Sequence, residues 1–208
     1  MTEVSAAPQG GLDTVEPGFA HPQLESQATF RKLLDALSRP GRLIALEGPK
    51  PPAGLTPSSA AIALTLFDFD TQIWLPATLG ANVRDWLKFL CSSPITADPK
   101  AAAFAILNTA KDDVQLGAFF EGDAKYPDRS TTLVLQVEAL VGGPTVTLEG
   151  PGVNGTIEIA PKGLPSDFWD QWTANGERFQ FGVDVFLASE DAVIGLPRTS
   201  RVVSTSSN

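Results

Sequence analysis

Histidine and cysteine are almost absent from this chain, which has one of each among its 208 residues. The single cysteine, Cys91, excludes an intramolecular disulfide and a zinc site built from cysteines. The single histidine, His21, excludes a His-rich metal centre and a pair of histidine general acids. No G-x-S-x-G motif accompanies it, so we expect neither hydrolase chemistry nor a metal site. We interpret His21 as an exposed residue without a catalytic role and Cys91 as buried packing.

Clustered positive charge and long apolar runs are also missing. The formal net charge is −9 and the sequence pI is near 4.5, which disfavours non-specific nucleic-acid binding because phosphate neutralisation needs grouped Lys and Arg. No apolar run approaches the roughly 18 residues that span a bilayer. The N-terminus has neither the basic nor the apolar segment of a secretory signal. We therefore expect a cytoplasmic protein that binds neither nucleic acid nor membrane.

The length and the distribution of Pro and Gly predict one domain with loose ends. Residues 1–20 are rich in Pro and Gly and poor in large apolar groups, which is typical of a flexible arm. Residues 21–203 are predicted to form a single α/β domain. Residues 204–208 are polar and are expected to form a frayed tail.

Hydrophobic periodicity predicts helices over residues 24–38, 58–67, 79–91 and 165–173, and a further helical segment over 114–120 that Gly117 interrupts. In the first helix Phe30, Leu33, Leu34 and Leu37 share the apolar face. Strands are predicted over residues 42–46, 71–75, 102–107, 131–137, 145–148, 156–159, 183–188 and 192–196. Helices and strands alternate in the first half and strands cluster in the second. This order predicts an α/β fold with a mixed sheet.

Three further patterns have simple structural interpretations. The Gly150-Pro151-Gly152 stretch lies between predicted strands, which favours a turn over a phosphate-binding loop. Asp68 and Asp70 follow a predicted helix, where turn and capping roles are more common than metal ligation. No lysine has the surroundings of a Schiff-base residue, so no pyridoxal-phosphate cofactor is expected.

The best candidate site is Arg198, Thr199, Ser200 and Arg201, directly after the last predicted strand. Arginine forks match phosphate or carboxylate oxygens, and neighbouring hydroxyls supply further donors. These four residues are therefore predicted to bind an anionic substrate. A solvated strand end or an interface salt bridge explains the same residues, and the sequence leaves both interpretations open. No residue is assigned a catalytic role.

Several collinear segments between about residues 22 and 203 resemble the PhnH-type subunit of the bacterial carbon–phosphorus lyase system. They are residues 30–41 (FRKLLDALSRPG), 64–75 (LTLFDFDTQIWL), 133–137 (LVLQV), 148–153 (LEGPGV), 181–185 (FGVDV) and 194–199 (IGLPRT). Each is weak alone, and their order along the chain makes the resemblance specific. The N-terminal arm is the one visible departure.

The resemblance implies a three-layer α/β/α sandwich similar to the large domain of pyridoxal-phosphate-dependent transferases, without that cofactor. It also implies a homodimer and partner subunits of the G, I and J types. Together these would transfer an alkylphosphonate to the ribose C1 of ATP and release adenine, before another subunit cleaves the C–P bond. The chain would be inactive alone and would share an ATP or phosphonate site with its partners. The alternative is a structural scaffold that never contacts substrate.

Overall fold

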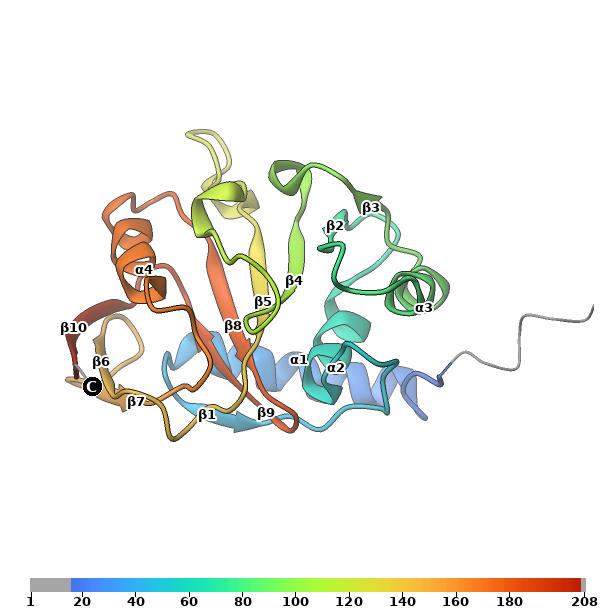
Figure 1. The fold of residues 1–208 in the computed structure, drawn as a ribbon, viewed down its shortest axis with the longest axis horizontal. Coiled ribbons are helices and arrows are strands. Elements are labelled where there is room, and N and C mark those ends of the chain that lie inside the picture. The colour runs from blue at the N-terminus through green and yellow to red at the C-terminus, as the bar shows by residue number, and fades with distance from the viewer. Residues whose placement is uncertain (1–15, 207–208) are drawn as a thin grey trace, which may run out of the picture.

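A seven-stranded mixed sheet forms the centre of the computed structural model, which describes residues 16–206 (Figure 1). Its strand order is β1-β9-β8-β5-β4-β2-β3. The strands are β1 (Leu43–Ala45), β2 (Ile73–Trp74), β3 (Ile95–Thr96), β4 (Phe104–Asn108), β5 (Thr132–Gln136), β8 (Asp184–Ala188) and β9 (Ala192–Leu196). The predicted N-terminal arm lies mostly outside the described residues.

The direction of the strands confirms a mixed sheet. Strands β3, β2, β4, β5 and β8 are parallel to one another, and β9 is antiparallel to both of its neighbours, β8 and β1. The central strands β4, β5 and β8 are buried on both faces, which explains why their sequences are nearly continuous apolar runs. Strands β8 and β9 form a hairpin because the polar residues 189–191 make a tight turn between them.

A second, three-stranded antiparallel sheet has the order β10-β6-β7. It consists of β6 (Val146–Glu149), β7 (Ile157–Ile159) and β10 (Arg201–Thr205). Figure 1 places it at one end of the molecule, with α3 at the opposite end. Strand β10 includes Ser204 and Thr205, two residues that the composition had assigned to a polar tail.

Each face of the large sheet is covered by its own hydrophobic cluster, because successive side chains of a strand point to opposite faces. On the first face, Ile106, Val134 and Phe186 join residues of α1 (Pro22–Ser38), α2 (Pro57–Leu66) and α3 (Ala81–Cys91). On the second face, Leu107, Leu135 and Leu187 join the small sheet and α4 (Phe168–Glu177). None of the helices in residues 16–206 combines the length and hydropathy that crossing a bilayer requires.

Helix α1 is rotated relative to the face that its sequence predicts. Leu33 is buried as expected, but Phe30 and Leu34 are 46% and 53% exposed. The small residue Ala36 takes the central position instead, against Gly195 of β9. A Cβ at Gly195 would lie 2.5 Å from the Ala36 backbone, so this approach requires a glycine. The predicted buried face was wrong because it was based on the large apolar residues of the helix, whereas the close approach of the helix to β9 favours a small residue at the contact.

Two other helix predictions need correction. The segment 114–120 contains only a short 3₁₀ turn, Leu116–Ala118, because Gln171 of α4 engages its backbone. The Gln171 side chain accepts a hydrogen bond from the Leu116 amide at 2.9 Å and donates one to the Val114 carbonyl at 2.9 Å. Helix α4 begins at Phe168, three residues later than predicted, and continues to Glu177. The two hydrogen bonds of the Gln171 side chain are tertiary contacts, which hydrophobic periodicity does not predict.

Substitution of Gly195 by alanine tests the approach of α1 to the sheet. We expect Gly195→Ala to lower the free energy of unfolding by about 1–3 kcal/mol, because the new methyl group would overlap the Ala36 backbone. Gly117→Ala is the matched control, since nothing lies within 4 Å of a Cβ there. Urea denaturation measures both. Equal stability of the two variants would contradict the close packing.

Candidate functional site

The predicted site residues occupy the loop that leads from β9 to β10. Arg198, Thr199 and Ser200 form the loop and Arg201 is the first residue of β10. The loop lies against the Gly150–Gly152 turn, where a Cβ on Gly150 would come within 2.8 Å of the Thr199 carbonyl oxygen. Gly150 and Gly152 have φ angles of +143° and +88°, as the predicted turn requires.

The guanidinium of Arg198 points inward and forks onto Asp184, the first residue of β8. Its Nη2 donates to Asp184 Oδ2 at 2.6 Å and its Nε donates to Oδ1 at 3.2 Å, while the Arg198 amide donates to Oδ1 at 2.7 Å. Nη1 also donates to the Pro127 carbonyl at 2.9 Å, and Nη2 donates to the Ser130 hydroxyl. The pair is largely covered, with side-chain exposures of 12% and 22%. An anion at Arg198 would therefore compete with a bidentate carboxylate.

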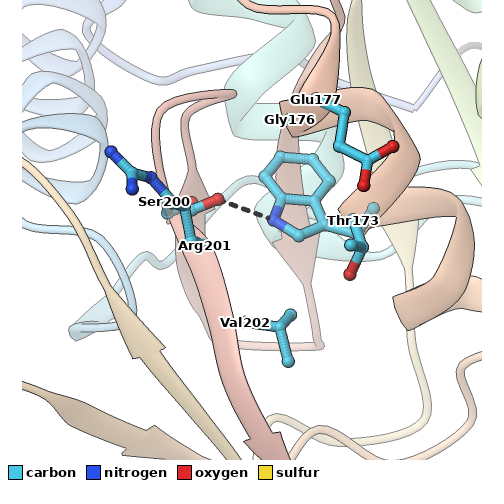
Figure 2. Close-up of a pocket in the computed structure, with 7 residues that line it drawn as sticks. Thr173, Gly176, Glu177, Ser200, Arg201 and Val202 are labelled. Atoms are coloured by element: carbon cyan, nitrogen blue, oxygen red, sulfur yellow. Dashed lines mark hydrogen bonds between the residues drawn. The ribbon is translucent and has the colours of Figure 1, made fainter.

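Ser200 is equally committed to the loop. Its hydroxyl and its amide both donate to the Pro197 carbonyl, at 2.7 and 2.8 Å, and the residue is 1% exposed. Its own carbonyl accepts a hydrogen bond from the Trp172 indole at 3.1 Å (Figure 2, dashed line). These bonds hold the start of β10 against α4. Ser200 thus defines the shape of the loop.

Arg201 differs from Arg198 in both its exposure and its ion pairing. It is exposed, and it makes no ion pair with any residue between 16 and 206. It contributes to two neighbouring cavities of about 350 and 260 Å³, which also share Gly176 of α4. Both predicted arginines line the smaller cavity, but Arg198 is bound to Asp184 whereas Arg201 is exposed to solvent.

The walls of these cavities are mainly apolar. Trp172, Thr173 and Glu177 line the larger cavity from α4, while Ser200, Arg201 and Val202 line it from the other side. Figure 2 shows Arg201 and Glu177 on opposite sides of the cavity. Pro151, Phe179, Arg198 and Thr199 complete the smaller one. The pair of cavities, called here the α4–β10 groove, combines an aromatic surface with the exposed Arg201, the ion-paired Arg198 and the carboxylate of Glu177. This arrangement suits binding.

Two functional neighbours of the predicted site were missed. Asp184 is one, although the hairpin register places it opposite Pro197 and next to Arg198, so counting from the predicted turn would have found it. Asn175 is the other: it is fully buried, and its side chain forms two hydrogen bonds with the Val183 backbone, of 2.9 and 3.0 Å. No sequence pattern predicts that the side-chain amide of a helix residue will hydrogen-bond the backbone just before β8.

The remaining candidates take structural roles. The Asp68 carboxylate accepts hydrogen bonds from the Asp70 amide and the Thr71 hydroxyl, which confirms the predicted turn. His21 is exposed and directly precedes α1, as expected. Among residues 16–206 no three His, Cys, Asp or Glu side chains come together as metal ligands would. Cys91 is buried on α3, where desolvation raises the pKa of its thiol to about 12.

Fold and site together define a mixed α/β protein whose α4–β10 groove lies where a small second sheet meets helix α4. A family model described as "Bacterial phosphonate metabolism protein (PhnH)" matches residues 17–203. The chain therefore belongs to the PhnH family, which confirms the resemblance seen in its sequence.

Two curated proteins illustrate this membership. The chain is 42% identical over 186 residues to the alpha-D-ribose 1-methylphosphonate 5-triphosphate synthase subunit PhnH of Rhizobium meliloti (strain 1021). That alignment covers 88% of this chain and 93% of the relative. It is 30% identical over 177 residues to a putative C-P lyase subunit protein, HtxG, of Stutzerimonas stutzeri, with 85% of each protein covered.

The contrast between the two arginines can be tested by stability. We expect Arg198→Ala to lower the free energy of unfolding by about 2–4 kcal/mol, because it leaves the half-buried Asp184 carboxylate without its partner. Arg201→Ala is the control and should change it by less than about 0.5 kcal/mol, since Arg201 is exposed. Urea denaturation compares the two. An Arg198→Ala variant as stable as the parent would show that the ion pair does not hold the loop.

The reactivity of Cys91 should follow its raised pKa. Its thiol pKa of about 12, against an ordinary value of 9.0, leaves about 1,000-fold less thiolate near neutral pH. Alkylation of the folded chain should therefore be slow at pH 8 and should quicken about tenfold per pH unit. Unfolding in urea should abolish the protection. Rapid alkylation under native conditions would contradict the burial of this thiol.

The same shift makes a prediction about stability. Because the folded pKa exceeds the unfolded one, the contribution of Cys91 is fully present below pH 9 and is lost as the pH rises from 9 toward 12. A Cys91→Ala variant should lack this loss. The measurement is the difference in unfolding free energy between parent and variant at pH 7 and pH 10. An unchanged difference would exclude the shift.

Proposed function

We propose that this chain is a non-autonomous subunit of a carbon–phosphorus lyase complex in organic phosphonate catabolism. The complex transfers an alkylphosphonate to the ribose C1 of ATP. An oxygen of the phosphonate bonds to C1, the bond from C1 to adenine breaks, and adenine leaves. The observation that carries this proposal is the 42% identity to the methylphosphonate 5-triphosphate synthase subunit along nearly the whole of both chains.

The chemistry of the described residues supports a subunit that needs partners. The α4–β10 groove offers arginines, one carboxylate, hydroxyls and aromatic walls, which are groups that can hold an anionic ligand. We propose that the subunit acts as a homodimer in the cytoplasm, together with subunits of the G, I and J types. The reacting groups would then come from those subunits.

We further propose that the loop of Arg198, Thr199, Ser200 and Arg201 contributes to a phosphate-rich site shared with a partner subunit. Arg201 is the member that contacts the anion, because its guanidinium is exposed beside the groove. Arg198 and Ser200 position the loop through their bonds to Asp184 and Pro197. Thr199 lines the smaller cavity and supplies a hydroxyl.

The finer description of the fold is also a proposal. We propose a three-layer α/β/α sandwich similar to the large domain of pyridoxal-phosphate-dependent transferases. It is supported by the division of the core, with α1, α2 and α3 on one face of the large sheet and α4 on the other. The proposal includes the absence of that cofactor, since no lysine stood out in the sequence as a Schiff-base residue.

Reconstitution tests the function directly. The chain would be co-expressed with G-, I- and J-type subunits, and adenine release from ATP and methylphosphonate would be measured. We expect Arg201→Ala to lower kcat/KM for adenine release by about tenfold or more, since a charge-assisted hydrogen bond is worth about 1.5–3 kcal/mol. Arg201→Lys should recover part of it, and Arg31→Ala on α1 is the matched control.

The scaffold alternative makes the opposite prediction. It is favoured by the commitment of Arg198 to Asp184, which removes one of the two predicted anion ligands from solvent. If the complex assembles and Arg201→Ala releases adenine at the parental rate, the loop does not contact substrate and the scaffold role holds. If the complete complex releases no adenine, the transferase proposal itself fails.

A further inference from the structure

A third cavity, of about 630 Å³, lies at the amino-terminal ends of the parallel strands β2, β4 and β5. Phe104 and Thr132, the first residues of β4 and β5, line it together with the segments that precede them. Its volume is within the range of roughly 300–1,000 Å³ of ordinary small-molecule sites. Open α/β sheets usually bind ligands at the carboxyl ends of their strands, so the fold alone does not predict a site here. A ligand of this cavity, called here the amino-end cavity, is therefore selected by its lining residues.

Four charged side chains line the amino-end cavity without being ion-paired. They are two cations, Lys100 and Arg129, and two carboxylates, Asp70 and Asp128. All four are exposed, and none of them forms an ion pair with any residue between 16 and 206. Their formal charges cancel, whereas the whole chain has a net charge of −9. The cavity therefore offers charges of both signs to a ligand.

Arg198 fixes the wall of the cavity that carries Arg129. Its Nη1 donates to the Pro127 carbonyl at 2.9 Å and its Nη2 donates to the Ser130 hydroxyl, so the short 3₁₀ turn between these residues is held at both ends. The Arg129 guanidinium lies over the Tyr126 ring, with its Cζ 3.9 Å from the ring centroid. Stacking uses the face of a guanidinium and leaves the N–H donors at its edge available to an anion.

The turns that carry the other cation and its neighbouring carboxylate are fixed in a similar way. The Asp98 carboxylate accepts a hydrogen bond from the Lys100 amide at 2.9 Å, and the Asp68 carboxylate accepts one from the Asp70 amide at 3.0 Å. In both turns the backbone is held while the charged end of the side chain is exposed. A site whose backbone is ordered before binding loses less conformational entropy when it takes a ligand. Only side-chain ends need to be ordered in the amino-end cavity.

The donors of the cavity suit a phosphonate group better than a carboxylate. A phosphonate, like a phosphate monoester, carries up to about two negative charges and has three acceptor oxygens. Lys100 and Arg129 match those charges, and Thr132 supplies a hydroxyl. The Ser130 hydroxyl accepts from Arg198 and keeps its own proton for a further acceptor. A carboxylate, with one charge and two oxygens, would leave part of these donors unused.

The carboxylates and the aromatic walls define the rest of the ligand. Asp70 and Asp128 attract an ammonium group. Phe104 and Phe120, both half-buried, place apolar surface beside the charged groups, which suits a short carbon chain. A ligand without an ammonium group would bring its negative charge close to two unpaired carboxylates. The lining therefore selects against simple anions and in favour of a zwitterion.

We propose that the amino-end cavity binds an aminoalkylphosphonate, a small zwitterion whose ammonium and phosphonate groups are joined by a short carbon chain. The phosphonate lies against Lys100 and Arg129, and the ammonium group lies against Asp70 and Asp128. The choice of a phosphonate as the oxyanion rests on the function proposed above, whereas the preference for a zwitterion does not. The site is distinct from the α4–β10 groove, although Arg198 lines the smaller cavity of that groove and also holds the turn that carries Arg129.

Isothermal titration calorimetry on the purified full chain tests the class of ligand. Aminoethylphosphonate should bind with a Kd below about 1 mM, the upper end of ordinary substrate affinities. Ethylphosphonate lacks the ammonium group and β-alanine replaces the phosphonate by a carboxylate, so each should bind about tenfold more weakly or worse. Absence of saturable binding of aminoethylphosphonate in that range, or equal binding of ethylphosphonate, would overturn the proposal. Equal binding of β-alanine would overturn the assignment of the oxyanion as a phosphonate.

Substitutions test where the zwitterion binds. Lys100→Ala and Arg129→Ala should each raise the Kd of aminoethylphosphonate about tenfold, because each removes a charge-assisted hydrogen bond. The double variant Asp70→Asn/Asp128→Asn should weaken aminoethylphosphonate but not ethylphosphonate, since it removes the partners of the ammonium group alone. Arg31→Ala, at an exposed residue of α1, is the matched control and should bind like the parent. All variants should keep the circular dichroism of the parent, because the substituted residues are exposed. Parental affinity in both cation variants, or equal weakening of both ligands in the double variant, would overturn the site.

Failure of this site and failure of the proposed function give different results. If aminoethylphosphonate does not bind the chain and the reconstituted complex still releases adenine from ATP and methylphosphonate, only the site is wrong. If aminoethylphosphonate binds as expected and the complete complex releases no adenine, the zwitterion site stands and the transferase proposal fails.

Discussion

The ion pair between Arg198 and Asp184 is the interaction on which the second half of this protein depends. It joins the first residue of β8 to the loop after β9, and it reaches the Pro127 carbonyl as well. The segment around Pro127 is thereby held against the two ends of the β8–β9 hairpin, at one corner of the large sheet. A forked arginine suits this task because its donors have fixed directions, so the bond sets orientation as well as distance.

That corner determines the shape of the groove. Arg198 is turned inward, and the chain continues through Ser200 into β10 beside α4. The Ser200 carbonyl accepts a hydrogen bond from the Trp172 indole N–H. Arg201 then stands in solvent at the mouth of two cavities. One arginine builds the loop and the next is available to a ligand.

Much of the fold follows from local pattern. The β8–β9 hairpin was predictable because residues 189–191 form a polar turn between two apolar runs. Helix α3 was predictable because Val83, Trp86 and Leu87 repeat at helical spacing and are buried. The buried face of α1 was not, because Gly195 lets the Ala36 backbone approach the sheet. The segment 114–120 was not either, because the Gln171 amide that engages it lies more than fifty residues away.

The sequence by itself determined the α/β class, the mixed sheet, the family and the loop that carries Arg198 and Arg201. Periodicity, turn residues and collinear motifs are local properties, and each can be read without knowing what lies across the fold. Only the tertiary structure decided which arginine faces solvent and which face of α1 is buried. Those outcomes depend on partners distant in sequence, namely Asp184 for Arg198 and Gly195 for Ala36.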